Sequence, residues 1–187
     1  ESTYSKFYGL LSERLCSSHK SWRPAFEKIF QQNYDDCGEL EPFQLRTIGK
    51  FWGHILASDY IGFEVLEYVH MGEEETTAPG RIFLKFMMQE LVADLGIEEL
   101  NRRLADEYIQ PFLKNLLPLS DPAKMRYSIN YFTAIGLGAV TEKMREKLNI
   151  INESIKEGKQ VGMQAGGDTK RGRDRFANVR DTKSQDK

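Results

Sequence analysis

Histidine and cysteine are the residue types in this sequence that could bind a metal or supply a nucleophile. There are three histidines and two cysteines. Cys16 and His19 stand three residues apart, but no second pair follows, whereas a zinc site needs several ligands that converge at fixed spacing. No Ser or Cys lies in a G-x-S-x-G or comparable turn beside a base. We therefore predict no metal, no cofactor and no catalytic residue.

Runs of carboxylates are the second feature with chemical potential, because a buried carboxyl group whose pKa is raised can act as a general acid. The runs here fall at helix ends and in loops, where water keeps them ionised: Asp35–Asp36, Glu73–Glu75 and Glu98–Glu99. The sequence therefore does not predict an enzyme. Glu73, Glu74 and Glu75 repel one another and serve no helix face. They form either an ordinary solvated loop or a docking site for a basic partner, and we keep them as candidate partner-binding residues.

The segment 42–57 has the period of an amphipathic helix. Its apolar face holds Trp52, and the opposite face holds Arg46, Lys50 and His54. These three residues are either solvated surface groups or partner contacts, and they are the second candidate binding set. We also expect Phe86, in the strongly apolar segment 81–95, to be interior together with Trp52.

Ser, Thr, Pro and Gly residues divide the first 150 positions into segments of helical length. The expected helices cover about 4–16, 22–37, 42–57, 60–71, 78–95, a short piece from 97, a piece from 111, 121–136 and 141–148. No segment alternates like a strand, so the fold is predicted to be all-α. Short loops favour antiparallel neighbours, and a row of such pairs is a HEAT-like stack of antiparallel helical hairpins. No internal repeat supports this; the stacking is inferred from the helix count alone.

Charge separates the predicted domain, 1–150, from a predicted flexible tail, 151–187. The tail holds nine Lys or Arg and six Asp or Glu, which leaves 17 basic and 22 acidic residues in the domain. An acidic domain does not fit a fold that grips a phosphate backbone. The mildly basic tail carries a cluster that could contact RNA weakly or act as a nuclear import signal: Lys170, Arg171, Arg173 and Arg175.

Three further observations bear on the chain's setting. Two cysteines without close spacing suit free thiols better than a secreted disulfide framework. There is no charged-then-apolar leader and no apolar run that could span a bilayer, so we expect no membrane association. The sequence does not start with Met, and we expect it to be part of a longer chain.

Beyond these patterns, several segments occur in an order that resembles one family. They are "TYSKFYGLLSERLC", "LRTIGKFWGHILASDYIGFEVLEYVHMGEEETT", "RIFLKFMMQELVADLGIEELNRRL", "YIQPFLKNLLP" and "RYSINYFTAIGLGAVTEKMREKL". Together they resemble the C-terminal MA-three domain of nucampholin-type pre-mRNA splicing factors, which are spliceosomal relatives of translation initiation factor four-G. The resemblance covers roughly residues 1 to 150.

The resemblance implies a nuclear, non-catalytic scaffold that docks on spliceosomal core proteins and supports splicing and exon junction complex assembly. In that family a preceding domain holds a DEAD-box ATPase, and the positions that bind the ATPase cannot be carried over to this sequence. The family's Ser- and Arg-rich extension is barely represented. The alternative is the MA-three domain of a ribosome-biogenesis or translation-control factor, which would itself bind a DEAD-box ATPase.

Overall fold

The computed structural model describes residues 4–165, and every regular element among them is a helix. Contacts divide the chain into one unit that ends at Leu148 and a second that begins at Asn149. The all-α prediction is confirmed for the described residues. The elements are α1 (Lys6–Ser18), α2 (Trp22–Asp35), η1 (Asp36–Glu39), α3 (Pro42–Ala57), η2 (Phe63–Tyr68), α4 (Ala78–Leu95), α5 (Ile97–Leu104), η3 (Gln110–Leu113), α6 (Pro122–Ala134), η4 (Gly138–Thr141) and α7 (Glu142–Ala165).

Local sequence signals account for the helix ends. The side chain of Thr77 accepts a hydrogen bond from the Gly80 amide at the start of α4. Asp121 caps α6 in the same way, through the amides of Ala123 and Lys124. Such caps satisfy amides that have no partner within the helix. Gly96 ends α4 with φ +78°, a left-handed conformation that glycine adopts without steric cost.

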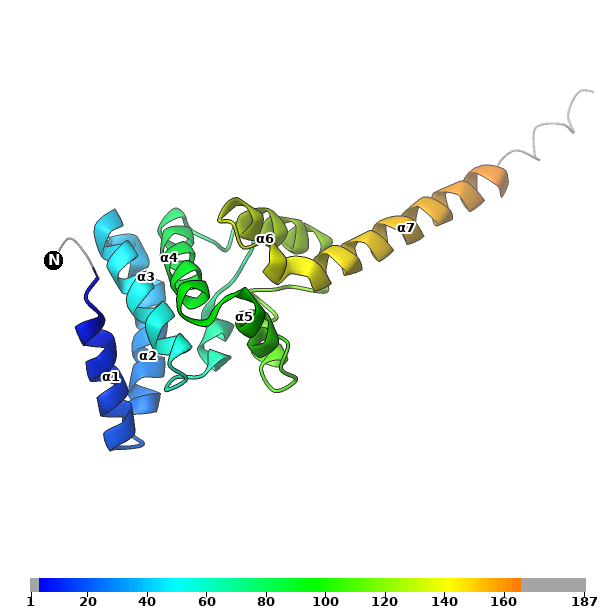
Figure 1. The fold of residues 1–187 in the computed structure, drawn as a ribbon. Coiled ribbons are helices and arrows are strands. Elements are labelled where there is room, and N and C mark those ends of the chain that lie inside the picture. Colours follow the sequence, from blue (N-terminus) through cyan, green and yellow to red (C-terminus); the bar gives the residue numbers. More distant parts are fainter. Residues whose placement is uncertain (1–3, 166–187) are drawn as a thin grey trace, which may run out of the picture. The chain divides into compact units, whose positions relative to one another are not determined.

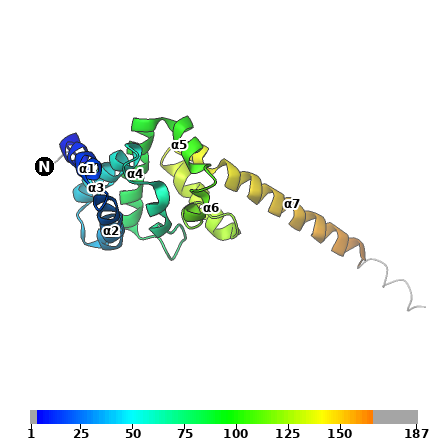
Figure 2. The same ribbon diagram turned by 90° about the horizontal axis from the view of Figure 1, so that it is seen from below.

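The core of the first unit is built on α3 and α4, which lie side by side between the α1–α2 pair and the later helices (Figures 1 and 2). Lys50 pairs with Glu90 and His54 with Asp94, so position numbers rise together and the two helices run parallel. Trp52 is fully buried, as predicted, and its ring meets that of Phe30 edge-on at 5.1 Å between centroids. Helix α1 packs on α3, and α3 packs on α4. The predicted stack of helices is present, but its central pair is parallel, where antiparallel hairpins were predicted.

Two predicted helices are only 3₁₀ turns. The expected helix over 60–71 is η2, and the expected helix from 111 is η3. The apolar residues of the first segment are nevertheless buried: Ile61, Phe63, Val65, Leu66 and Val69. Burial of side chains on several sides of a short segment is satisfied by an irregular chain, and here it outweighs the preference for α-helix.

The last helix also differs from the prediction. It was expected to end near Leu148, with flexible chain from position 151, but α7 continues through Ala165. The tail cluster formed by Lys170, Arg171, Arg173 and Arg175 lies outside the described residues. Of the helices that the structure describes, none is both long and apolar enough to cross a membrane.

Candidate protein-interaction surface

The polar face of α3 does not form one exposed set as predicted. Lys50 donates from Nζ to Oε2 of Glu90 on α4 at 3.0 Å. His54 lies between two carboxylates, with Nδ1 3.0 Å from Asp94 Oδ2 and Nε2 3.2 Å from Glu13 Oε1. Its side chain is only 13% exposed. The expectation that His54 is a solvated surface residue is therefore wrong, because the polar stripe of α3 faces the polar stripes of α1 and α4.

These polar contacts fasten α1 and α4 onto α3. Gly9 of α1 passes directly over the His54 ring, where a Cβ would stand 2.2 Å from Cδ2. Tyr4 lies beside the same ring, with centroids 6.4 Å apart. Burial, followed by the nearby carboxylates of Glu90 and Asp94, raises the pKa of Tyr4 to about 12. The phenol therefore stays neutral, and the cluster has a structural role.

Arg46 remains on the surface and is part of a larger group. Its Cζ lies 5.6 Å from the centre of the Phe86 ring, and Lys85 Nζ lies 5.7 Å from the same centre. Phe43, one helical turn before Arg46, is 56% exposed. We call Phe43, Arg46, Lys85 and Phe86 the basic–aromatic patch. Phe86 is half-buried, so the prediction that it is interior is wrong, because two cations hold it at the surface.

The loop between η2 and α4 that contains Glu73–Glu75, here called the acidic loop, is fixed by hydrogen bonds to a buried residue. Thr76 is buried, and its hydroxyl donates to the His70 carbonyl at 2.7 Å and accepts from the Gly72 amide at 3.1 Å. Glu75 forms an ion pair with Lys124 of α6 at 2.6 Å. Glu73 and Glu74 are exposed, and neither pairs with any residue in the described part of the chain. The loop thus presents two unneutralised carboxylates on a fixed support.

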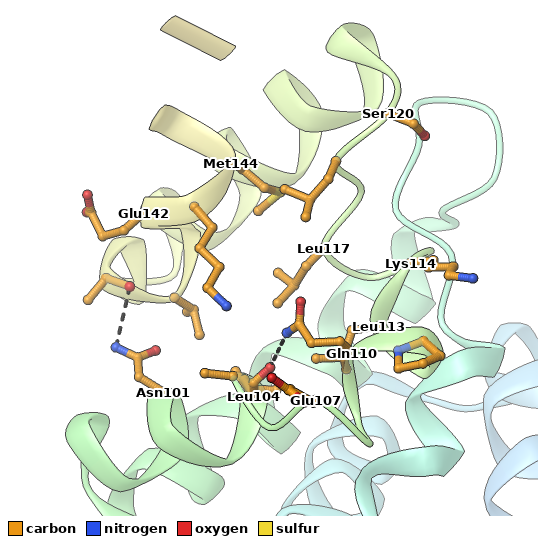
Figure 3. Close-up of a pocket in the computed structure, with 16 residues that line it drawn as sticks. Asn101, Leu104, Glu107, Gln110, Leu113, Lys114, Leu117, Ser120, Glu142 and Met144 are labelled. Atoms are coloured by element: carbon orange, nitrogen blue, oxygen red, sulfur yellow. Dashed lines mark hydrogen bonds between the residues drawn. The ribbon is translucent and has the colours of Figure 1, made fainter. Parts of the chain in front are cut away.

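A pocket of about 740 Å³ lies between α5, η3, the 114–120 loop, η4 and the first turn of α7 (Figure 3). Gln110 donates to the Leu104 carbonyl, and Asn101 donates to the Ala139 carbonyl at 3.4 Å, which holds the walls in place. The pocket's lining contains no histidine or cysteine. Its charged groups are exposed and of both signs: Glu107, Lys114, Glu142 and Lys143. The pocket offers apolar contact area.

The remaining reactive groups lie apart from one another. Cys16 and Cys37 are free and buried, and burial raises the pKa of both thiols, so they are protonated at neutral pH. Among the residues that the structure describes, no three His, Cys, Asp or Glu side chains gather to hold a metal. What the described surface offers is therefore contact area: the basic–aromatic patch and the acidic loop.

Comparison with known proteins shows what this chain is similar to. Residues 1–62 match the MA3 domain. Over 148 residues, 79% of this chain, the sequence is 54% identical to pre-mRNA-splicing factor CWC22 of Eremothecium gossypii, of which the match covers 27%. The chain is homologous to a segment of the CWC22 splicing factors. CWC22 of Saccharomyces cerevisiae is 48% identical, and the match covers 82% of this chain and 26% of the relative. The Mus musculus CWC22 homologue is 44% identical, and the match covers 78% of this chain and 16% of the relative.

The chain thus spans about a quarter or less of the length of these CWC22 relatives. The match confirms the family resemblance derived from the sequence. Sequence reasoning nonetheless missed Phe43 and Lys85 as surface residues. Phe43 could have been found, because it stands three positions before Arg46 on the polar face of α3, where an apolar ring signals a contact surface.

Proposed function

We propose that this chain is a non-catalytic protein-interaction domain that docks a nuclear splicing factor on the spliceosome core and thereby supports splicing and exon junction complex assembly. The identity of 54% with a CWC22 splicing factor over 148 residues is the observation that carries this proposal. The stacked helices support the proposal physically, because the apolar stripes pack against one another inside the stack and an extended outer face remains for partners.

The proposed contacts are the basic–aromatic patch and the acidic loop. Arg46 combines a permanent charge with a stacked ring, a pairing that is enriched at protein interfaces. Glu73 and Glu74 carry charge that no described residue neutralises, so a basic partner surface would gain charge-assisted contacts there. Lys50 and His54 act as supports, since their contacts with carboxylates hold the helices that present these surfaces.

Other partners follow from the family. A DEAD-box ATPase would be held mainly by a preceding domain, outside this sequence, and the RNA contact proposed for the basic tail would be weak. The second candidate is the MA3 domain of a ribosome-biogenesis or translation-control factor that binds a DEAD-box ATPase. The free carboxylates of Glu73 and Glu74 favour it, because they would suit a basic ATPase surface.

Charge reversal tests the proposal. Arg46→Glu, and Glu73→Lys with Glu74→Lys, are introduced separately and together into the full-length protein, and complexes are recovered by pull-down from nuclear extract. Lys147→Glu, an exposed site on α7 away from both surfaces, is the matched control. We expect the combined variant to recover at least about tenfold less of the spliceosomal proteins, because it reverses three charges on the two surfaces. Unchanged recovery would show that neither surface contacts spliceosomal proteins. Recovery of ribosomal or translation factors would favour the second candidate function.

A further inference from the structure

Helix α1 carries large apolar side chains on its exposed side, whereas the exposed side of a helix at the end of a stack is usually polar. Phe7, Leu10 and Leu11 are 64%, 57% and 44% exposed. Gly9, Ser12 and Cys16 occupy the buried side. The first group follows the i, i+3, i+4 spacing of a single helical face, about 180° from the second. The outer face of α1 is therefore an apolar stripe with no cover among the described residues; we call it the α1 stripe.

Such a face differs from what a terminal repeat needs. In stacked helical folds the outer face of the end repeat is polar, because an apolar one would aggregate in water. In α1, Leu10 and Leu11 instead resemble the core-facing residues of an interior helix. The second helix of the pair adds to this, since Trp22 and Ile29 of α2 are also at least 40% exposed. The hairpin has the character of an internal member of a stack.

The exposed charges of the α1–α2 pair are mostly basic, and its exposed carboxylates are Glu27 and Asp35 of α2. Arg14, one turn beyond Leu10 and Leu11, is exposed, and so are Lys20, Arg23 and Lys28. None of these four forms an ion pair within the part of the chain that the structure describes. Two copies of this surface would repel each other, which disfavours a homodimer through the stripe. A covering helix with carboxylates beside its apolar seam would complement it.

We propose that the α1 stripe is covered by an amphipathic helix with acidic flanks from another part of the same polypeptide, so that the stack continues past α1. Repeats in such stacks contact their neighbours in the chain, and tethering gives the covering helix an effective concentration in the millimolar range for a short linker. The CWC22 relatives are long enough to supply such a helix, because this chain matches no more than 27% of the length of each relative compared above.

Cysteine labelling tests this cover directly. Leu10→Cys is labelled with a maleimide in residues 1–187 and in the full-length protein, where Cys16 and Cys37 are buried and slow to react. Asn130→Cys, exposed on α6, is the matched control. We expect position 10 to react at least about tenfold more slowly in the full-length protein, because a covered side chain reacts only when the contact opens, while position 130 reacts equally in both. Equal rates at position 10 would overturn the proposal.

Crosslinking from the same cysteine identifies the occupant. A mixture of isotopically light and heavy full-length protein is crosslinked at position 10 and examined by mass spectrometry. Crosslinks within one polypeptide, to an acidic amphipathic segment, support the proposal, and mixed light–heavy crosslinks overturn it in favour of a second copy. Arg14→Glu should restore fast labelling at position 10; an unchanged rate would overturn the acidic-flank part. Circular dichroism verifies that each variant is folded.

Discussion

Gly53 of α3 lies directly against Met87 of α4: a Cβ added at Gly53 would stand 2.5 Å from the Met87 carbonyl oxygen. One turn earlier, a Cβ at Gly49 would stand 2.7 Å from the Phe83 carbonyl. Backbone atoms cannot move aside as a flexible side chain can, so these two glycines set the separation of the two central helices. The ion pairs that fasten α4 to α3 depend on that separation.

Gly53→Ala should therefore destabilise the domain in spite of alanine's better helix propensity. The added methyl group pushes α4 away, and we expect a loss of about 2 kcal/mol in the free energy of unfolding. Urea denaturation followed by circular dichroism measures it. Gly38→Ala is the control, because nothing lies within 4 Å of a Cβ there. Equal effects of the two changes would contradict the close-contact interpretation.

Trp52 is the largest side chain that is fully buried. Trp52→Ala should cost on the order of 3 kcal/mol through the cavity it leaves, measured by thermal melting. Phe86→Ala should cost well under half as much, since Phe86 is half-buried. Trp52 Nε1 has no hydrogen-bond partner, so Trp52→Phe loses no hydrogen bond and should be milder than Trp52→Ala. A Phe86→Ala loss equal to that of Trp52→Ala would contradict the surface position of Phe86.

Lys50 and Glu90 test the buried side of the α3–α4 contact. Glu90 is 8% exposed, so Lys50→Met strands a buried carboxylate and should cost about 2 kcal/mol, less than for a fully buried pair because Lys50 is partly exposed. Adding Glu90→Gln removes the stranded charge and should recover part of the loss. A double-mutant cycle in urea gives the coupling energy. Strictly additive losses would show that the two groups do not interact.

Glu99 should make the stability of the domain depend on pH in a predictable direction. Hydrogen bonds from Arg102 and then Arg103 lower the pKa of Glu99 to about 2. A lowered carboxyl pKa means that the stabilisation is fully present above the unfolded pKa, near 4.5, and is lost as pH falls through about 2. The stability difference between the wild type and Glu99→Gln should therefore shrink over that range in acid titrations. Because Glu99 is on the surface, the effect should also weaken in high salt. A difference that is constant with pH would contradict the pairing.

The regular period and the capping residues predicted the main helices well. Trp52 and the residues around it follow a 3.6-residue stripe. Thr77 and Asp121 cap helices that begin close to the predicted starts at 78 and 121. Helix α3 begins and ends at the predicted positions, 42 and 57, and α5 begins at the predicted position, 97. Segment 63–68 was predicted less well, because burial pattern alone does not separate a 3₁₀ turn from an α-helix.

The candidate surface was only partly predictable, since one helix's pattern does not reveal what faces it. His54 lies on the polar side of α3, yet Asp94 and Glu13 cover that side. Which polar stripes meet depends on tertiary packing of α1 and α4, a long-range property. The prediction that Phe86 is interior failed for the same reason, because Phe86 belongs to an apolar helix but meets Arg46 at the edge of the stack. The loop glutamates were chosen as candidates because their charge has no local explanation, and Glu73 and Glu74 are exposed in the structure.

Crosslinking within assembled splicing complexes tests the central claim most directly. Lys85 belongs to the basic–aromatic patch, and Lys124 lies beside the acidic loop. The tagged full-length protein is purified with its complexes, treated with a lysine-reactive crosslinker and analysed by mass spectrometry. A docking domain predicts crosslinks from Lys85 and Lys124 to spliceosomal core proteins. Crosslinks from these lysines only to ribosome-biogenesis or translation factors, or to no partner in complexes that crosslink elsewhere, would contradict it.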